Sequence, residues 1–339
     1  MKNKRILVLG GTGSLGFALI KRLVDDNSVI VYSRDEAKHW TIRNEVQNKN
    51  LQCAVGDIRD ASRVSEVILK YKPNIIIIAA ALKQVDTCEL SPYESIQTNI
   101  IGVKNVTDAV ELNMPRLEDS LECVLMVSTD KAYAPANVYG MCKAISERLV
   151  TSRAAEYSRV KFVSVRYGNV LESRGSIIPL FRHQAINGKA FTLTHREMTR
   201  FLMTLDDSID LILNTAKNAN SGETWLPKLK SMRILDLAKI FARRHDKPVK
   251  VIGMRPGEKL HEALLSDAES PRVRDIGDHY ILGAAYGDVD KNAKTFEYTS
   301  ADDVLSEAAL EAYLSNIGIF EKSLDEFPGL HIEEIRTGG

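Results

Sequence analysis

The stretch Ile6-Leu7-Val8-Leu9-Gly10-Gly11-Thr12-Gly13-Ser14-Leu15-Gly16 decides the fold class of this chain. An apolar run typical of a buried strand leads into a turn with the spacing Gly-x-x-Gly-x-x-Gly, and a helical pattern begins there. Glycine at Gly10 and Gly13 lets the backbone turn tightly and approach a pyrophosphate, which amides at a helix start stabilise. A glycine triad alone is weak evidence, but its strand, turn and helix context favours a dinucleotide site over a simple tight turn.

Similar apolar runs alternate with helical patterns through the first half of the chain. Strands are predicted at 6–9, 29–32, 52–55, 74–79, 124–127 and 162–165. Several of them are apolar without alternation, as strands buried on both faces must be. Helices are predicted at 16–25, 61–71, 93–112 and 139–157. This βαβ series predicts an α/β fold with a Rossmann-like, doubly wound parallel sheet.

After about Val170 the alternation stops, and loops rich in glycine and proline separate shorter elements. We therefore expect a dinucleotide-binding domain at 1–170, with a returning segment near 205–235. A smaller, discontinuous substrate-binding lobe would take 171–204 and 236–330, and 331–339 would form a tail. Ser300, followed by Asp303, resembles a capping box before a helix over 304–314.

The composition excludes several classes of protein. Of 339 residues, 44% are hydrophobic and 27% are charged, and the formal net charge is zero, so neither nucleic acid nor an anionic membrane is an expected partner. The four cysteines lack C-x-x-C spacing and the seven histidines form no cluster, so we expect reduced thiols and no metal. No apolar run approaches the ~18 residues of a membrane span, which predicts a soluble, cytoplasmic protein.

The ends of the predicted strands suggest how a dinucleotide binds. Ser33 and Arg34 follow the second strand, where NAD-preferring sites place a carboxylate, and both can bind a 2′-phosphate, so NADP is favoured over NAD. Asp35 could still bind a ribose, and Asp57 could accept a hydrogen bond from adenine. The full predicted cofactor set is Gly10, Thr12, Gly13, Ser14, Leu15, Gly16, Ser33, Arg34, Asp35, Lys38, Asp57, Ile58, Ala79, Ala80, Ala81, Ser128, Tyr139 and Lys143.

The segment after the fifth strand carries the chemistry. Ser128, Thr129, Asp130 and Lys131 follow the strand at the edge where parallel sheets bind ligands. Tyr139 and Lys143 lie four residues apart on a predicted helix, so they share a face, where the ammonium is expected to favour the phenolate. A tyrosine so placed can act as a base near neutral pH. A lone Tyr-x-x-x-Lys is more often an ordinary exposed helix, so the other features must support this interpretation.

Taken together, these motifs resemble the extended short-chain dehydrogenase/reductase superfamily, and most closely its soluble inverting UDP-N-acetylglucosamine 4,6-dehydratases of the polysaccharide biosynthesis protein family. The resemblance spans most of the chain, to about Glu262. It rests on the segments 32–36, 80–83, 128–132, 166–170, 198–201 and 255–259. The Asp130-Lys131 pair discriminates within the superfamily, since retaining dehydratases usually have Asp-Glu there and epimerases have small hydroxyl residues. Lys83-Gln84 and Thr194-His195 depart from the usual pattern, which leaves the exact hexose open.

This resemblance implies a reaction and a set of residues. Tyr139, assisted by Lys143, would take the 4-hydroxyl proton as hydride leaves carbon 4 for NADP⁺; Lys131 would remove the carbon 5 proton, and Asp130 would assist loss of the 6-hydroxyl. The product would be a 4-keto-6-deoxy sugar nucleotide inverted at carbon 5. The expected catalytic residues are Asp130, Lys131, Tyr139, Lys143 and Thr129, and the expected substrate-binding residues are Lys83, Asn169, Thr194, Arg255 and Glu258. The resemblance also suggests a homo-oligomer, a dimer or a hexamer, with a UDP-sugar as substrate.

Other functions remain open at this point. A UDP-sugar 4-epimerase shares the fold and the Tyr-Lys pair but returns hydride to carbon 4 and needs no Asp130-Lys131 pair. A non-catalytic NADP-binding redox sensor would not need Tyr139, Lys143 and Lys131 together. Lys131 could also be a structural ion-pair partner.

Overall fold

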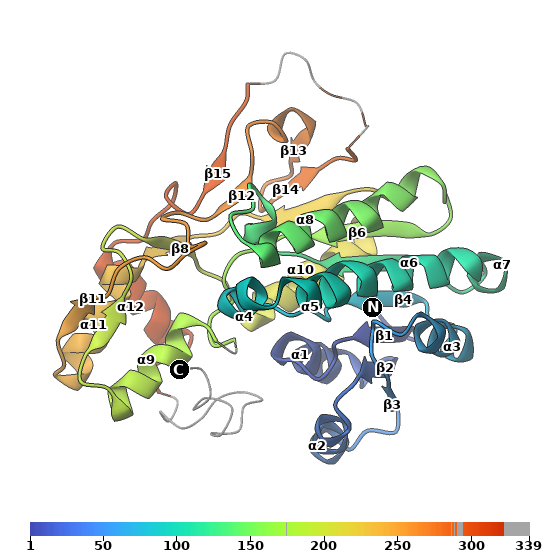
Figure 1. Ribbon diagram of the computed structural model, residues 1–339, viewed down its shortest axis with the longest axis horizontal. Coiled ribbons are helices and arrows are strands. Elements are labelled where there is room, and N and C mark those ends of the chain that lie inside the picture. Colours follow the sequence, from blue (N-terminus) through green and yellow to red (C-terminus); the bar gives the residue numbers. More distant parts are fainter. Residues whose placement is uncertain (174, 286, 288, 290–293, 322–339) are drawn as a thin grey trace.

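The computed structural model describes residues 1–173, 175–285, 287, 289 and 294–321. Its centre is a nine-stranded sheet with the order β13-β14-β9-β6-β5-β4-β1-β2-β3 (Figure 1). The strands of this sheet are β1 (Arg5–Leu9), β2 (Ser28–Ser33), β3 (Leu51–Val55), β4 (Ile75–Ile78), β5 (Cys123–Val127), β6 (Lys161–Val165), β9 (Thr224–Pro227), β13 (Val273–Asp275) and β14 (His279–Leu282). The six predicted strands are therefore confirmed, as is the α/β fold class with its large parallel sheet.

Strand direction shows where this sheet binds ligands. The strands from β3 to β9 run parallel, and only β14 and β13 are added antiparallel at the far edge. The chain winds outward from β1 through β2 to β3, then returns to place β4 on the other side of β1. The order therefore reverses between β1 and β4, and doubly wound sheets bind ligands at such a switch point, outside the carboxyl ends of the strands.

The helices pack on both faces of the sheet and on the second lobe. They are α1 (Ser14–Leu23), α2 (Glu36–Val46), α3 (Ala61–Tyr71), α4 (Val85–Leu90), α5 (Pro92–Ile96), α6 (Gly102–Leu112), α7 (Met114–Leu117), α8 (Val138–Thr151), α9 (Ile177–Asn187), α10 (Leu205–Asn218), α11 (Ile234–His245) and α12 (Glu307–Asn316). The helix predicted over 93–112 is interrupted by a π-helical turn at Gln97–Ile101. The prediction did not include α2, which has little amphipathic pattern to reveal it.

Alternate residues of the strands enter two separate cores, as the period of two requires. Ile75 and Ile77 of β4 join the core with α1 and α10, while Ile76 and Ile78 join the core with α3 and α6. All four isoleucines are at most 3% exposed, and burying one such side chain stabilises the fold by about 1.5–3 kcal/mol. An unbroken apolar run was thus the correct sign of a strand covered on both faces.

The second lobe has its own core. Phe181 of α9, Phe191 of β7 and Phe241 of α11 pack edge to face there, together with Leu310 and Leu314 of α12. Figure 1 shows these elements beside the carboxyl edge of the main sheet. The small sheets are made by β7 (Phe191–Leu193), β8 (Thr199–Phe201), β10 (Ser231–Arg233), β11 (Val249–Val251), β12 (Ala263–Leu265) and β15 (Tyr298–Thr299).

The main sheet takes in parts of the chain on both sides of the predicted boundary. β9 pairs with β6, as the returning segment near 205–235 would require. β14 pairs with β9 and β13 pairs with β14, so two strands from the range 236–330 complete the main sheet. The predicted tail at 331–339 lies outside the described residues.

The predicted capping box at Ser300 was wrong. Helix α12 begins at Glu307, and the Ser306 hydroxyl accepts a hydrogen bond from the Ala309 amide. Ser300 is fully buried; its hydroxyl donates to the Thr199 carbonyl and accepts from the Glu262 amide. Tertiary contacts therefore use the hydroxyl that the local pattern assigned to a helix start.

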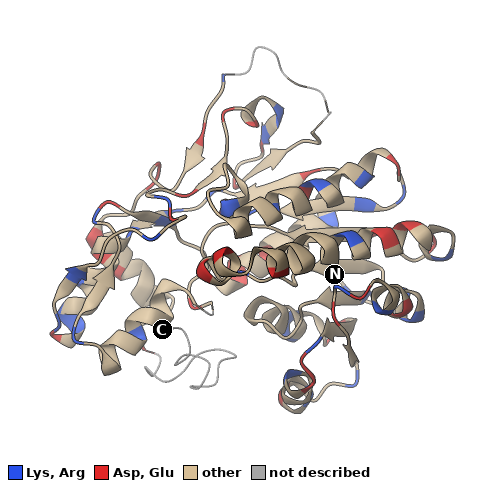
Figure 2. Cartoon of the chain, in the orientation of Figure 1, with Lys and Arg blue, Asp and Glu red and all other residues tan. Residues whose placement is uncertain are grey.

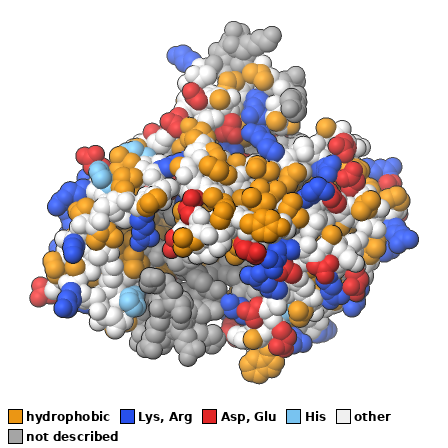
Figure 3. Space-filling view, in the orientation of Figure 1, with side chains coloured by type: hydrophobic (Ala, Val, Ile, Leu, Met, Phe, Trp, Pro, Cys, Tyr) orange, Lys and Arg blue, Asp and Glu red, His pale blue; other side chains and the backbone are white. Residues whose placement is uncertain are grey.

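The surface carries both charged and hydrophobic side chains. Acidic and basic residues are mixed over both lobes in Figure 2, and hydrophobic side chains gather on the face of Figure 3. The exposed hydrophobic residues of α4, α5 and α8 are Leu90, Tyr93, Ile96, Met141 and Ile145. Among the described residues, no helix has the length and apolar character to cross a bilayer. Within the same residues, no three His, Cys, Asp or Glu side chains are grouped as metal ligands.

Candidate active site

The glycine turn lies at the switch point between β1 and β4. Gly10 has a φ of +84°, and a Cβ there would lie 2.6 Å from the Ala80 Cα, so glycine alone fits between the two strand ends. Helix α1 starts after Gly13 without a side-chain cap. The first-turn amides of Ser14, Leu15 and Gly16 therefore have no competing side-chain acceptor at the position where a pyrophosphate would lie.

A buried asparagine holds the segment after β4 in place. Asn99, only 1% exposed, accepts a hydrogen bond from the Leu82 amide at 2.8 Å and donates to the Leu82 carbonyl at 2.9 Å. Ser146 of α8 donates to the Asn99 carbonyl. This clamp fixes Ala79, Ala80 and Ala81 opposite the glycine turn. Asn99 was not predicted as a site residue; its signal in the sequence is a polar residue inside a helical apolar pattern.

The predicted residues at the ends of β2 and β3 also lie together. The Thr12 hydroxyl donates to the Ser33 hydroxyl at 3.1 Å, and Arg34 lies 3.7 Å from the Asp57 carboxylate. Asp35 caps α2 by accepting from the Lys38 amide. Ile58 is buried. Side-chain contacts therefore join Thr12 to Ser33 and Arg34 to Asp57 at the ends of these strands.

Lys131 lies between two carboxylates. Its ammonium is 2.9 Å from Asp130 Oδ1 and 3.1 Å from Glu262 Oε1. Thr129 orients the pair, since its hydroxyl donates to Asp130 Oδ1 at 2.8 Å. Arg200 Nε also approaches Glu262 Oε1, at 3.8 Å. Glu262 was not predicted as a site residue; it lies 131 residues along the chain from Lys131, and only folding brings the two together.

Burial sets the electrostatics of this cluster. It raises the pKa of Asp130, which is 1% exposed. Burial alone would lower the pKa of Lys131, but Asp130 and Glu262 raise it well above its ordinary value. Burial would raise the pKa of Glu262, yet Lys131 and Arg200 hold it below its usual range. The resting lysine is therefore cationic.

Two acceptor atoms in the cluster remain open. Asp130 Oδ2 and Glu262 Oε2 are buried and have no hydrogen-bond partner among the described residues. The Ser128 hydroxyl and Asn169 Oδ1 share this state within the described chain. Buried polar atoms are almost always paired in folded proteins, so these four mark where a polar ligand would bind.

A close backbone approach brings Tyr139 to this cluster. A Cβ at Gly140 would lie 2.1 Å from the Lys131 carbonyl oxygen, so only glycine lets the first turn of α8 pack there. Asn137 caps the same turn by accepting from the Gly140 amide at 2.8 Å. Tyr139 is 9% exposed.

The ionisation of Tyr139 differs from the sequence-based expectation. Burial raises its pKa to about 12, while the Lys131 charge opposes that shift. Lys143 donates to the Val127 carbonyl at 2.6 Å, and burial lowers its pKa to about 8. The phenol is therefore protonated at neutral pH, and Lys131 is a cation that favours its ionisation. The local spacing placed both residues on α8 correctly but did not account for their desolvation.

The predicted substrate residues lie on several separate segments. Asn137 donates to the Gly257 carbonyl at 3.0 Å, which places the exposed Arg255 and the partly exposed Glu258 beside the start of α8. The Arg255 amide donates to Glu258. Lys83 is exposed on the segment that Asn99 clamps. The Thr194 hydroxyl bonds Met198 within the second lobe.

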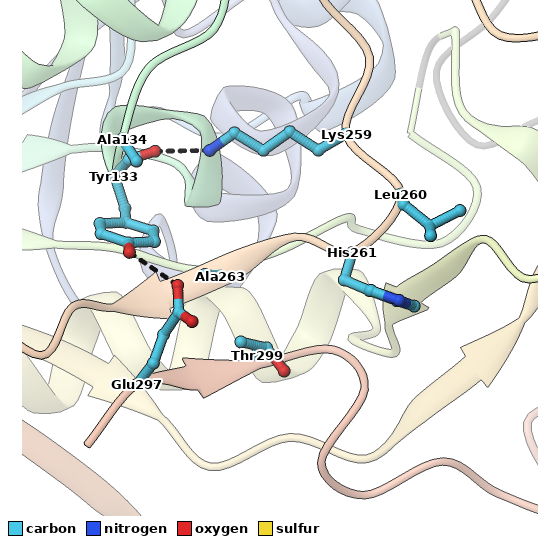
Figure 4. Close-up of a pocket in the computed structure, with 8 residues that line it drawn as sticks. All are labelled: Tyr133, Ala134, Lys259, Leu260, His261, Ala263, Glu297 and Thr299. Atoms are coloured by element: carbon cyan, nitrogen blue, oxygen red, sulfur yellow. Dashed lines mark hydrogen bonds between the residues drawn. The ribbon is translucent and has the colours of Figure 1, made fainter.

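A pocket of about 430 Å³ adjoins the cluster (Figure 4). Tyr133 points across it to Glu297, with 2.6 Å between the hydroxyl and the carboxylate, and Lys259 donates to the Tyr133 carbonyl at 2.6 Å. Ala263 follows Glu262 directly, so this wall lies next to the residue that flanks Lys131. The predicted site residues do not line this pocket.

The chain matches the model of a family described as "Polysaccharide biosynthesis protein" over residues 6–283. It is 36% identical over 314 residues to a Methanocaldococcus jannaschii protein described as an uncharacterized membrane protein, covering 89% of this chain and 92% of that one. It is 38% identical over 292 residues to a UDP-glucose 4-epimerase of Rickettsia rickettsii, covering 83% of each.

Solved structures show the same architecture. Pen from Bacillus thuringiensis superposes with a TM-score of 0.86 at 31% identity, covering 94% of this chain and 99% of that one. A dTDP-glucose 4,6-dehydratase from Streptomyces venezuelae, solved with NAD, has a TM-score of 0.65 at 20% identity, covering 76% of this chain and 86% of that one. The chain therefore belongs to the polysaccharide biosynthesis protein family and shares the Rossmann-like fold of short-chain dehydrogenase/reductase epimerases and dehydratases.

Proposed function

We propose that this protein is an NADP-dependent inverting 4,6-dehydratase of UDP-N-acetylglucosamine, a hydro-lyase. The product would be a UDP-2-acetamido-2,6-dideoxy-4-keto-hexose with carbon 5 inverted, used for surface glycan biosynthesis. The observation that carries this proposal is the buried Asp130-Lys131 pair beside Tyr139. Such a pair offers one acid and one base in addition to the tyrosine, as loss of water across carbons 5 and 6 requires.

The residues present fit a nicotinamide dinucleotide. Gly10 and Gly13 leave room for a pyrophosphate, and the uncapped start of α1 offers amides to it. The open Ser128 hydroxyl and the Lys143 ammonium lie at the carboxyl end of β5, where the nicotinamide half would bind. Bound NADP supplies a reversible hydride acceptor for carbon 4 of the sugar.

Oxidation of carbon 4 needs a group that takes the 4-hydroxyl proton. Tyr139 is the candidate, and Lys131 favours its phenolate. Because burial opposes that ionisation, the phenol would first release its own proton to solvent, and a further positive charge nearby would favour this release. The resulting ketone makes the neighbouring carbon 5 proton acidic.

Asp130 and Lys131 exchange a proton before elimination in this proposal. The two atoms lie 2.9 Å apart, so the Lys131 ammonium can pass a proton to Asp130 Oδ1 and become an amine. The amine removes the carbon 5 proton, and the Asp130 carboxyl protonates the departing 6-hydroxyl as water. The original ion pair is then restored. Carbon 6 of the resulting enone would take back the hydride that left carbon 4, and carbon 5 would take a proton from the opposite face of the ring, so from a donor other than Lys131.

The substrate would extend from this cluster towards the second lobe. Arg255 can bind the diphosphate, Glu258 can accept from the ribose, and Asn169 has an open carbonyl oxygen for a polar partner. Lys83 and Thr194 are secondary candidates. We expect a homo-oligomer in a cytoplasmic setting.

A second candidate function is a UDP-sugar 4-epimerase. Several relatives carry the name UDP-glucose 4-epimerase at 37–38% identity over 292 residues. In that case Lys131 would be a structural ion-pair partner of Glu262, and hydride would return to carbon 4.

One experiment separates the two candidates. The purified protein is incubated with UDP-N-acetylglucosamine in deuterated water, and the products are analysed by NMR. Deuterium at carbon 5 together with a carbon 6 methyl group is the expected result. A 4-epimer without deuterium at carbon 5 would establish the second candidate instead.

Lys131 variants test the step that distinguishes the reactions. Lys131→Ala is expected to slow dehydration by about 10²–10⁴-fold, the usual contribution of a positioned acid or base. Lys131→Arg keeps the ion pair with Glu262 but provides no amine, so it should slow dehydration as much as Lys131→Ala does. An arginine variant with parental activity would assign Lys131 to a structural role.

A further inference from the structure

We propose that His39 is a positioning residue that sets the preference for NADP over NAD by fixing the Ser33 hydroxyl as a hydrogen-bond donor. This inference rests on the proposed dinucleotide site and adds a residue to it. His39 is 1% exposed beneath the end of β2, and its Nε2 lies 2.6 Å from the Ser33 oxygen. Such a short contact from a buried ring holds the hydroxyl in one orientation.

The surroundings of Nδ1 indicate which nitrogen of the His39 ring carries the proton. Nδ1 of His39 is buried and has no hydrogen-bond partner within the described residues. Burial lowers the pKa of His39, so the ring is neutral near pH 7 and carries one proton. Buried N–H groups without a partner are rarer than buried acceptors without one, which places the proton on Nε2. His39 then donates to Ser33.

With His39 as the donor, the Ser33 hydroxyl has only its own proton left for a further hydrogen bond. A serine hydroxyl has two acceptor lone pairs and one donor. Thr12 donates to the Ser33 oxygen at 3.1 Å and His39 donates to it at 2.6 Å, so both lone pairs are used. The Ser33 proton is therefore directed to a ligand, and it needs an acceptor.

The surrounding charges favour an anion as that acceptor. Arg34, 60% exposed, adds a guanidinium next to Ser33. The two nearby carboxylates already face cationic or amide donors: Asp35 accepts from the Lys38 amide, and Asp57 accepts from Arg59 at 2.8 Å. A ribose 2′-hydroxyl is best bound by a free carboxylate, whereas a 2′-phosphate only accepts hydrogen bonds. The phosphate therefore matches the donors present.

Binding of the two dinucleotides to the full chain, freed of co-purified nucleotide, tests this inference by calorimetry. His39→Leu is expected to weaken NADP binding about fivefold, the value of one net hydrogen bond, with NAD binding nearly unchanged. Ser33→Ala should weaken NADP binding by about tenfold or more, because a charge-assisted bond is lost. Adding H39L to S33A should then cost nothing further, since His39 acts only through Ser33.

Conservative variants separate positioning from packing. His39→Gln can place an amide donor near Ser33 and should restore most of the NADP preference, whereas the shorter side chain of His39→Asn should not. Thr41→Ala removes a hydroxyl of the same helix that bonds the Ala37 carbonyl, and it should leave both affinities unchanged. If the leucine variant does not fold, the glutamine and asparagine variants decide.

Two results would overturn the inference. One is an equal fold loss of NADP and NAD affinity in H39L or H39N, and the other is no loss of NADP affinity in either variant. The reaction itself is not the readout. A protein that binds NADP through His39 and Ser33 but releases a 4-epimer would refute the proposed dehydration and leave this inference standing.

Discussion

At the scale of single residues, the least expected feature is that Lys131 has two carboxylate partners. A lysine held between Asp130 and Glu262 is cationic at rest, so it cannot remove a proton until it gives one up. Asp130, whose pKa burial raises, is the acceptor within reach. The proposed acid and base are thus two states of one hydrogen-bonded pair, and Glu262 controls how tightly the pair holds its shared proton.

Glu262 should therefore set the basic limit of activity. The pair needs one proton to act, and the negative charge of Glu262 raises its proton affinity. Glu262→Gln is expected to move the basic limb of the pH profile to lower pH by about one unit or more, where one unit corresponds to ~1.4 kcal/mol. The measurement is kcat/KM for deuterium incorporation at carbon 5, from neutral pH up to the highest pH at which the parent and the variant both stay folded.

Glu262→Asp is the matched control, because it keeps the charge and should keep the limb close to its parental position. A glutamine variant whose basic limb does not move would remove Glu262 from the reaction. The backbone of Glu262 is held by Ser300 in every variant, so the local fold has a support that the substitution does not touch.

At the level of secondary structure, the two glycines Gly13 and Gly16 at the start of α1 differ in how closely the surrounding backbone packs against them. A Cβ at Gly16 would lie 2.4 Å from the Gly11 Cα, within the backbone of the turn. A Cβ at Gly13 would meet only the Gly10 carbonyl oxygen, at 3.5 Å, and Gly13 has an ordinary φ of −80°. Packing therefore requires glycine at Gly16, whereas at Gly13 the described fold leaves room for a Cβ, on the side where the proposed pyrophosphate would approach.

This difference gives opposite expectations for two alanine variants. Gly16→Ala should lower the free energy of unfolding by about 1–3 kcal/mol, as overpacking does. Gly13→Ala should leave it nearly unchanged but weaken dinucleotide binding about tenfold or more, equivalent to ~1.4 kcal/mol. Thermal unfolding and calorimetry on the same samples measure both. Equal binding by Gly13→Ala and the parent would show that no pyrophosphate lies against the turn.

At the scale of the whole molecule, a buried ion cluster joins the main sheet to the segment that carries Glu262. Arg166, at the end of β6, is 2% exposed; it contacts Glu147 of α8 at 2.7 Å and Glu269 at 2.9 Å. It also donates to the Leu264 carbonyl of β12. These contacts hold α8, with Tyr139, in register with β12, which follows Glu262 directly.

Removing Arg166 should destabilise the fold strongly. Arg166→Met leaves the buried Glu147 without its ion-pair partner and Glu269 with only the more distant, half-exposed Arg148. We expect a loss of about 3–5 kcal/mol in the free energy of unfolding. Arg148→Met is the control: Arg148 lies 3.6 Å from Glu269 and is 49% exposed, so its loss should cost at most ~1 kcal/mol. Urea unfolding monitored by circular dichroism gives both values, and similar losses for the two variants would contradict the assignment.

The Arg166 contribution should also depend on pH. Burial would raise the pKa of Glu269, but Arg166 lowers it below the ordinary value. A carboxyl whose folded pKa is depressed stabilises the fold above its unfolded pKa, about 4.3, and loses that contribution as pH falls further. The stability difference between the parent and Arg166→Met should therefore be constant near neutrality and shrink below about pH 4.

Local patterns in the sequence were enough to predict the sheet, the glycine turn and the elements that carry Tyr139, Lys143, Asp130 and Lys131. Apolar runs and turn residues act over a few neighbours, so local patterns are enough to place them. The predicted capping box at Ser300 was wrong for the converse reason, because its hydroxyl bonds the distant backbone groups of Thr199 and Glu262.

Which charged groups lie close together, by contrast, depends on contacts between residues far apart in the chain. Glu262 reaches Lys131, His39 reaches Ser33 and Arg166 reaches Glu269 through folding, and desolvation then sets the proton affinity of each. Burial reversed the expected ionisation of Tyr139, because a buried phenolate loses more from desolvation than a neighbouring ammonium returns. Side-chain spacing fixes which residues lie on one face of a helix, but packing of the remaining elements determines how much water reaches them.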